Sequence, residues 1–378
     1  MTVIAGPASQ REATGMSPSD MRFLRTLVLE RSAIVLDETK TYLIASRLEP
    51  LARKEKLTSI TDLVNQLRKS PRGRLEQLVI EAMTTNETSF FRDSHPFGAL
   101  TDTIIPQILA DRGIAGGLTI WCGASSSGQE PYSIAIAIAD RFPELLAAGR
   151  LRILATDISP TMVDRTKSGR FTQLEVNRGL PARMLVRFFQ QDGNEWVANR
   201  ELRQAMDARV MNLITPWMNM PKCDIVFLRN VLIYFNPETK RTILERIRRE
   251  VIRPGGHLFL GSSETTLNID NGWIRDSTGR SVSYIAPPAE GTMPSTNAAT
   301  SPTPARPASI GGRPTPVGAS PVGNPARTPP VGTPPIGNPS LAPRSVPNRA
   351  IPIKAPQPLF QPSNRPAANL PSSQRRNP

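Results

Sequence analysis

From Leu118 onward the chain alternates short apolar runs with amphipathic stretches, and this alternation limits the folds open to it. The runs are LTIWCGA, LRILATDIS, ARVMNLI, CDIVFLRNVLIYF and HLFLGSS, and the stretches between several of them have helical spacing. Strands that alternate with helices predict a mostly parallel, doubly wound α/β sheet with helices on both faces. Ligands of such sheets bind beyond the carboxyl ends of the strands, so the residues that follow each run are candidates for a site.

Residues 17–83 have helical periodicity instead. Ser17 and Pro18 predict an N-cap and first turn, and three more helices follow, of which the second covers about 37–56 and is bent or interrupted near Pro50. The third begins at a cap at Ser59 or Thr61. The second helix is rich in cationic side chains, which predicts either a solvated face or a basic docking surface. These cations are Lys40, Arg47, Arg53, Lys54 and Lys56.

The C-terminal stretch 288–378 is dense in proline and nearly free of aromatic residues, so it cannot bury enough apolar surface to offset chain entropy. We expect this tail and residues 1–16 to be disordered, and PxxP-like stretches in the tail to bind a partner's groove or to act as a spacer. The tail holds nine Arg or Lys and one Glu, which leaves +6 of the net charge of +14 to the first 287 residues. That excess suits an acidic protein partner as well as nucleic acid.

Several functional classes are disfavoured by composition. The two cysteines and two histidines have no disulfide or zinc-site spacing, so we expect no metal. The N-terminus lacks a signal-peptide pattern, and no apolar run approaches the roughly 18 residues that a membrane span needs. We therefore expect a cytoplasmic protein without membrane insertion.

Small residues and acids follow the first two apolar runs. The loop 123–131 reads GASSSGQEP, and Asp157 comes at the end of the next run. A glycine-bearing turn followed by an acid after the second strand is the arrangement that grips an adenosine, although an ordinary loop and a helix-capping Asp157 are equally open. Glu130 would repel a pyrophosphate but suits a cationic ligand such as S-adenosylmethionine.

Two further stretches break the apolar pattern. Arg229 and Asn230 interrupt an apolar run, so we expect them at the rim of the sheet, and Tyr234 either shares that rim or is a core aromatic. TTNETSFFRD, residues 84–93, is polar and then aromatic and fits neither a strand nor a helix.

Taken in order, TTNETSFFRD, IWCGASSSGQEPYSIAI, ATDIS, VMNLI and FLRNVLIYF resemble the chemotaxis receptor methyltransferases of the CheR type, over about 17–287. The resemblance implies a Rossmann-like methyltransferase domain at 84–287, with a small subdomain at about 171–207, after a helical receptor-docking domain at 17–83. The implied enzyme is a protein-glutamate O-methyltransferase that moves the methyl group of S-adenosylmethionine to glutamates in the cytoplasmic helices of chemoreceptors and leaves S-adenosylhomocysteine.

The same resemblance implies roles for individual residues. Arg92 and Tyr234 would be catalytic. Cofactor contacts are implied for Asn86, Thr88, Arg92, Glu130, Asp157, Asn212, Leu213, Arg229 and Asn230. A glutamate acceptor needs no general base, since its unperturbed pKa of about 4.3 leaves it ionised at neutral pH.

The sequence departs from the family's pattern in two places, and two alternative functions remain open. Gln129 stands where the family often has a second acid, and the turn QQDGNEW is short, so we expect no grip on a receptor's tether peptide. The rivals are a degenerate signalling adaptor and a methyltransferase acting on another substrate. We expect a monomer that binds no nucleic acid, because the Asn/Asp-Pro-Pro-aromatic stretch of base-amine methylases is missing from the sequence.

Overall fold

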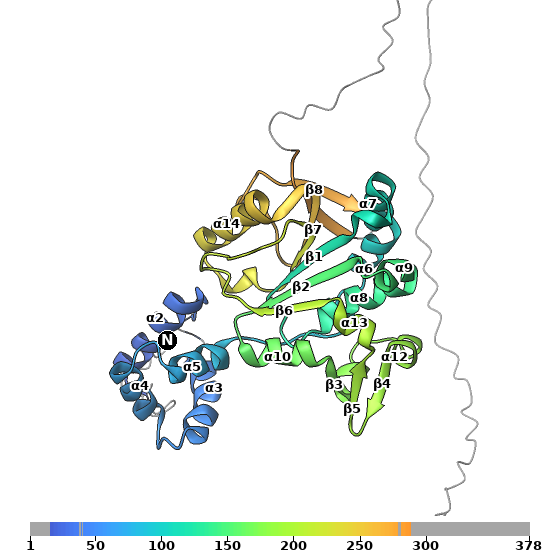
Figure 1. Cartoon of the computed structure of the whole chain (residues 1–378). Coiled ribbons are helices and arrows are strands. Elements are labelled where there is room, and N and C mark those ends of the chain that lie inside the picture. Colours follow the sequence, from blue (N-terminus) through green and yellow to red (C-terminus); the bar gives the residue numbers. More distant parts are fainter. Residues whose placement is uncertain (1–15, 38, 40, 279–280, 289–378) are drawn as a thin grey trace, which may run out of the picture. The chain divides into compact units, whose positions relative to one another are not determined.

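The computed structural model describes residues 16–37, 39, 41–278 and 281–288 (Figure 1). The two segments predicted to be disordered lie almost entirely outside these residues, as does Lys40. The described chain begins with a helical module and continues into a seven-stranded sheet.

Four helices form the helical module around one apolar core: α2 (Pro18–Ser32), α3 (Thr41–Lys54), α4 (Ile60–Lys69) and α5 (Arg74–Met83). The predicted caps are confirmed, since the Ser17 and Ser59 side chains accept the backbone N–H groups of Asp20 and Asp62. Of the two alternatives predicted at Pro50, the interruption is wrong, because α3 continues to Lys54, and the bend stays a prediction. Leu48 and Leu51, on either side of the proline, are both buried in the core, and this packing offsets the one hydrogen bond that proline cannot make.

The sheet has the predicted alternating architecture, with strand order β6-β2-β1-β7-β8-β10-β9. Its strands are β1 (Leu118–Gly123), β2 (Leu151–Asp157), β6 (Met206–Val210), β7 (Cys223–Leu228), β8 (Ile252–Leu260), β9 (Ile274–Thr278) and β10 (Ser281–Ile285). The first five strands of that order pair in parallel, and β10 pairs antiparallel with β8 and β9. The sequence RPGG, which has the residues of a turn, lies inside β8, where the pairing with β7 shifts register.

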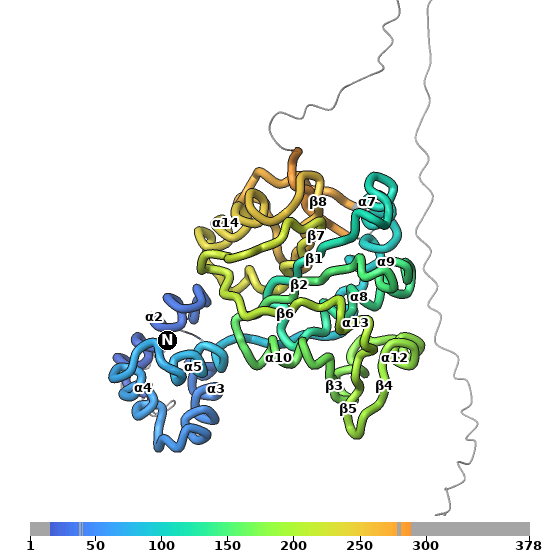
Figure 2. The backbone as a smooth tube through the Cα atoms, in the orientation of Figure 1, coloured from blue at the N-terminus to red at the C-terminus, as the bar shows by residue number. Residues whose placement is uncertain are grey.

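Both faces of the sheet are buried, as its near-continuous apolar strands require. Along β1, Ile120 packs into one core cluster with Ile134, while Trp121 packs into a second cluster with Leu244. Ile134 belongs to α8 (Gln129–Arg141) and Leu244 to α14 (Pro237–Arg246), so these helices cover opposite faces (Figure 2). The other helices of this domain are α6 (His95–Ala99), η2 (Leu100–Ile104), α7 (Ile105–Arg112), η3 (Ile114–Gly116), α9 (Pro143–Ala147), α10 (Pro160–Ser168), η4 (Leu232–Tyr234) and η5 (Ile247–Val251).

A three-stranded antiparallel sheet with strand order β3-β5-β4 lies between α10 and β6 in the sequence. Its elements are β3 (Arg170–Thr172), α11 (Gln173–Asn177), α12 (Ala182–Phe188), β4 (Phe189–Asp192), β5 (Glu195–Ala198) and α13 (Arg200–Gln204). Phe171 and Phe189 point into the main core cluster, where their rings stand edge to face. This small sheet therefore shares its core with the main sheet.

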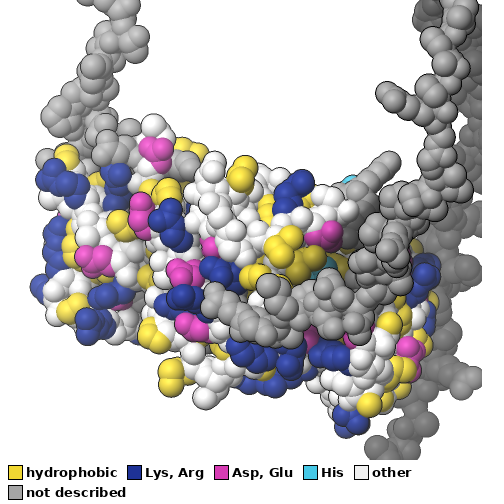
Figure 3. Space-filling view, turned by 90° about the horizontal axis from the view of Figure 1, so that it is seen from above, with side chains coloured by type: hydrophobic (Ala, Val, Ile, Leu, Met, Phe, Trp, Pro, Cys, Tyr) yellow, Lys and Arg dark blue, Asp and Glu magenta, His cyan; other side chains and the backbone are white. Residues whose placement is uncertain are grey.

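The surface is mixed in charge. On the face turned to the reader in Figure 3, Lys and Arg side chains are scattered among acidic and apolar ones. No helix among the described residues is long and apolar enough to cross a membrane. Within the same residues, no group of three or more His, Cys, Asp or Glu side chains is arranged so that it could bind a metal ion.

Candidate active site

Residues 84–93 cross from the helical module to the sheet, and their two phenylalanines fix the crossing. Phe90 is fully buried, with its ring 4.9 Å from that of Phe171 and 5.9 Å from that of Phe189. The Phe91 ring packs against Phe97 at 5.2 Å, and its backbone N–H donates to Ser133 Oγ at 2.9 Å. These anchors hold the polar residues on either side of them, including Arg92, beside the edge of the sheet.

The loop after β1 is held by the acid at the end of β2. Asp157 Oδ2 accepts the N–H of Ser126 at 2.8 Å, and Oδ1 accepts the N–H of Ser159 at 3.0 Å. The hydroxyl of Ser159, not the carboxylate of Asp157, accepts the N–H of Met162 and caps α10, so the capping alternative for Asp157 does not hold. Burial raises the pKa of Asp157, and the backbone N–H groups oppose that rise. A carboxylate has about four lone-pair sites, so Asp157 can still accept a further donor.

Arg229 and Glu130, both predicted cofactor contacts, bind each other. Arg229 Nη1 donates to Glu130 Oε2 at 2.7 Å, and its Nη2 donates to Asp93 Oδ2 at 2.7 Å and to the carbonyl of Arg92 at 3.1 Å. Burial raises the pKa of Glu130, and the charge of Arg229 works against that rise. Asp93 was not predicted, because only the folded chain brings it to Arg229.

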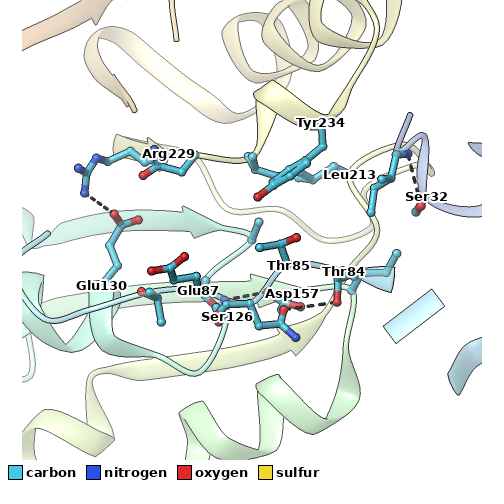
Figure 4. A pocket seen from close by; sticks show the side chains of 18 of the residues that line it. Ser32, Thr84, Thr85, Glu87, Ser126, Glu130, Asp157, Leu213, Arg229 and Tyr234 are labelled. Atoms are coloured by element: carbon cyan, nitrogen blue, oxygen red, sulfur yellow. Dashed lines mark hydrogen bonds and ion pairs between the residues drawn. The ribbon is translucent and has the colours of Figure 1, made fainter. Parts of the chain in front are cut away.

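Tyr234 is half-buried and faces the cavity, so the core-aromatic alternative does not hold (Figure 4). It ends the 3₁₀ turn η4, which follows Asn230, a residue with a positive φ of 58°. Its carbonyl accepts the N–H of Val35 at 2.9 Å, so the helical module is bound directly to this turn.

One cavity, partly open to solvent, brings all ten predicted site residues together. They are Asn86, Thr88, Arg92, Glu130, Asp157, Asn212, Leu213, Arg229, Asn230 and Tyr234. In Figure 4 the Tyr234 side chain points into the cavity between the Arg229–Glu130 pair at one end and Ser32 at the other. Ser32 and Ile34 also line the cavity and were not predicted, since nothing in the sequence ties the loop after α2 to the sheet.

Two predicted functional side chains have structural partners. The Asn212 amide donates to the carbonyl of Arg31 at 2.7 Å and accepts the N–H of Ile214 at 3.2 Å. Arg47 donates to the carbonyls of Met83 and Thr84 and to the hydroxyl of Thr85. Arg47 therefore anchors the start of the 84–93 segment instead of contributing a free cation to the basic surface predicted for α3.

Several residues that line or adjoin this cavity have a strained backbone conformation. Positive φ angles occur at Phe91 (47°), Asp93 (60°), Ala124 (54°), Ser126 (51°) and Asn230 (58°), none of which is a glycine. Such angles cost about 1–3 kcal/mol each and persist only where the surrounding structure holds them. Their concentration in three loops at one edge of the sheet is typical of a functional site.

The donors and acceptors in the cavity fit S-adenosylmethionine. Asp157 has free lone pairs for ribose hydroxyls, and Glu130 supplies a buried carboxylate for an ammonium. Arg229, which also lines the cavity, has a buried Nε that finds no hydrogen-bond partner among the described residues, and its guanidinium has the charge that suits a carboxylate. The cavity therefore offers groups of matching charge to both ends of an amino-acid-bearing nucleoside.

Comparison with known proteins identifies the family of the chain. The model of the CheR methyltransferase SAM-binding domain matches residues 86–281, and that of the CheR all-alpha domain matches residues 19–84. Chemotaxis protein methyltransferase 1 of Pseudomonas aeruginosa is 40% identical over 256 residues, which is 66% of this chain and 92% of that protein. Cher2 of Pseudomonas putida is 41% identical over 250 residues, 65% of this chain and 90% of that protein. A chemotaxis methyltransferase of Vibrio parahaemolyticus is 38% identical over 257 residues, 67% and 91% of the two chains. The chain belongs to the CheR family of S-adenosylmethionine-dependent chemotaxis methyltransferases.

Proposed function

We propose that this protein methylates glutamate side chains in the cytoplasmic helices of chemoreceptors and forms glutamyl methyl esters. The observation that carries the proposal is the composition of the cavity wall. Arg92 and Tyr234 share this cavity with Glu130 and Asp157, and its lining, within the described residues, includes no His, Cys or Lys. A carboxylate acceptor fits such a wall, because it is already ionised and needs no base.

We assign cofactor binding to groups at two ends of the cavity. Asp157 accepts hydrogen bonds from ribose, while Glu130 and Arg229 face the ammonium and carboxylate of the methionine part. Asn86, Thr88, Asn212, Leu213 and Asn230 complete the contacts. S-adenosylmethionine, when bound, supplies a methyl group on a positively charged sulfur.

Arg92 and Tyr234 act on the acceptor in this proposal. The guanidinium of Arg92 holds one oxygen of the receptor carboxylate, and the Tyr234 hydroxyl fixes its orientation, so that the other oxygen is free to react. Carboxylate charge disappears as the ester forms, so a strong ion pair would stabilise the ground state more than the transition state. Arg92 Nη1 already donates to the carbonyl of Glu87 at 3.2 Å, so part of its hydrogen-bonding capacity is used before the acceptor carboxylate binds.

A single incubation tests the proposal. The protein is mixed with methyl-labelled S-adenosylmethionine and receptor cytoplasmic fragments, and the label on the receptor is then exposed to mild base. Label that base releases as methanol supports a glutamyl ester. Base-stable label contradicts it and indicates another acceptor, and cofactor binding without any label would identify a binding protein instead of an enzyme.

A further inference from the structure

Glu264, in the loop after β8, binds backbone from two neighbouring strand ends. Its Oε2 accepts the N–H of Asn230 and the N–H of Gly261, each at 2.7 Å, and its Oε1 accepts the N–H of Ile233 at 3.2 Å. Hydrogen bonds to an ionised acceptor are about twice as strong as neutral ones. One side chain thus ties the end of β7 to the end of β8.

The backbone that Glu264 holds is strained. Asn230 has a positive φ of 58°, a conformation that needs outside support in a residue other than glycine. Gly261 leaves room for the contact, because a Cβ at this position would lie 2.7 Å from Glu264 Oε2 and 2.7 Å from Asn230 Nδ2. The geometry of both loops therefore depends on the same carboxylate.

Tyr234 follows directly on this restrained backbone. The N–H of Ile233 is bound by Glu264, and the carbonyl of Tyr234 is bound by Val35, so the turn is held on both sides of its last peptide. Among the described residues that line the cavity Glu264 is missing, so it acts there through the backbone it holds and through its charge, which adds to the raised pKa of Glu130. We propose that Glu264 is a positioning residue that fixes the Asn230–Tyr234 turn and with it the Tyr234 hydroxyl.

The backbone part of this inference is tested without cofactor or receptor. Glu264→Gln replaces one acceptor oxygen by an NH₂ group that cannot accept an N–H. We expect the amides that then face the NH₂ group, either Ile233 or the pair Asn230 and Gly261, to exchange hydrogen about tenfold faster or more in this variant. Glu245→Gln is the matched control, since Glu245 is also half-buried and pairs with Arg249 at 3.1 Å away from the cavity. Unchanged exchange at the three amides would overturn the proposal whatever the activity.

The catalytic part rests on the proposed function and is read from kinetics. Glu264→Gln should lower the single-turnover methylation rate about 10- to 100-fold while cofactor affinity changes about twofold or less, because the main loss is alignment and the Glu264 charge is the smallest cause of the raised pKa of Glu130. In a Tyr234→Phe background the same substitution should cost about twofold or less, since the group it aligns is gone. Equal losses in both backgrounds would overturn the positioning role. A wild-type protein that makes no base-labile ester contradicts the proposed function, and the exchange result then decides on Glu264 alone.

If Glu264→Gln does not fold, Glu264→Asp replaces it in both measurements. Its shorter side chain keeps the charge but cannot reach both strand ends. Faster amide hydrogen exchange and a lower single-turnover methylation rate than in the wild type support the proposal. Wild-type values for both contradict it.

Discussion

The Arg229 guanidinium and the Glu130 carboxylate form an ion pair at 2.7 Å in which only 1% of the Arg229 side chain is exposed. These residues lie 99 positions apart in the sequence: Arg229 directly follows β7, and Glu130 is in the first turn of α8. Glu130 therefore has a compensating charge in the folded chain before any ligand binds. We expect both the stability of this edge of the sheet and the proposed binding of the methionine part of the cofactor to depend on the pair.

Arg229→Ala should destabilise the protein by about 3–5 kcal/mol, because it leaves a buried carboxylate without its partner. Urea unfolding measures the loss. Arg170→Ala is the control, since Arg170 pairs with Asp192 and Glu195 at the exposed surface, where such pairs contribute little. Equal effects of the two substitutions would contradict a special role for the buried pair.

Cofactor affinity should fall as the pH drops from 7 toward the raised pKa of Glu130, because only the ionised carboxylate attracts an ammonium. Because the pKa of Glu130 is raised, the loss of affinity should begin at a higher pH than for a glutamate with the ordinary pKa of 4.5. Glu130→Gln should bind more weakly and show a flatter profile in calorimetric titrations. In the unliganded protein the sign is opposite: the stabilising contribution of Glu130 is complete below pH 4.5 and is lost as the pH rises through its folded-state pKa.

Arg92→Ala should lower methyl transfer about 100-fold or more while changing cofactor affinity much less, because its proposed task is to orient the acceptor. Single-turnover rates and calorimetry separate the two effects. Arg178→Ala is a suitable control, since Arg178 pairs with Glu87 beside the same segment at 3.1 Å but does not line the cavity. An unchanged single-turnover rate in Arg92→Ala would remove Arg92 from the catalytic assignment.

Gly179→Ala should be far more destabilising than Gly193→Ala. Both glycines have positive φ, 92° and 60°, so alanine is strained by about 1–2 kcal/mol at either position. A Cβ at residue 179 would also lie 2.0 Å from the carbonyl oxygen of Phe90, whereas residue 193 has open space. Thermal unfolding of the two variants, with cofactor binding as a second readout, isolates the collision, and equal melting temperatures would contradict it.

Arg53→Glu should slow receptor methylation, most strongly at low ionic strength, if α3 steers acidic receptor helices toward the cavity. Arg249→Glu is closely matched: both arginines are about 70% exposed, and each pairs with a glutamate one helical turn earlier. Equal rates for the two variants at low salt would argue against α3 as a docking surface.

Much of this site could be predicted from the sequence because parallel strands end at one edge of the sheet. Asp157 and Arg229 each lie at or next to the carboxyl end of a strand, so their positions in the sequence indicate that both lie at the same edge of the sheet. The partners of these residues could not be predicted. Asp93, Ser32 and Glu264 reach the cavity or its loops through packing between segments far apart in the chain. Arg47 does not differ in the sequence from the other cations of α3, because two of its acceptors are backbone carbonyls that any sequence would provide.

The bond from the Val35 N–H to the Tyr234 carbonyl also bears on how such proteins can diversify. It joins two modules through main-chain atoms alone, so nearly any side chain at either position preserves it, and only proline at residue 35 would remove the donor. The outer surface of the helical module can therefore change its side chains without loss of this link. Chimeras that exchange this module between relatives should keep their register with the tyrosine turn as long as the length of the loop after α2 is retained.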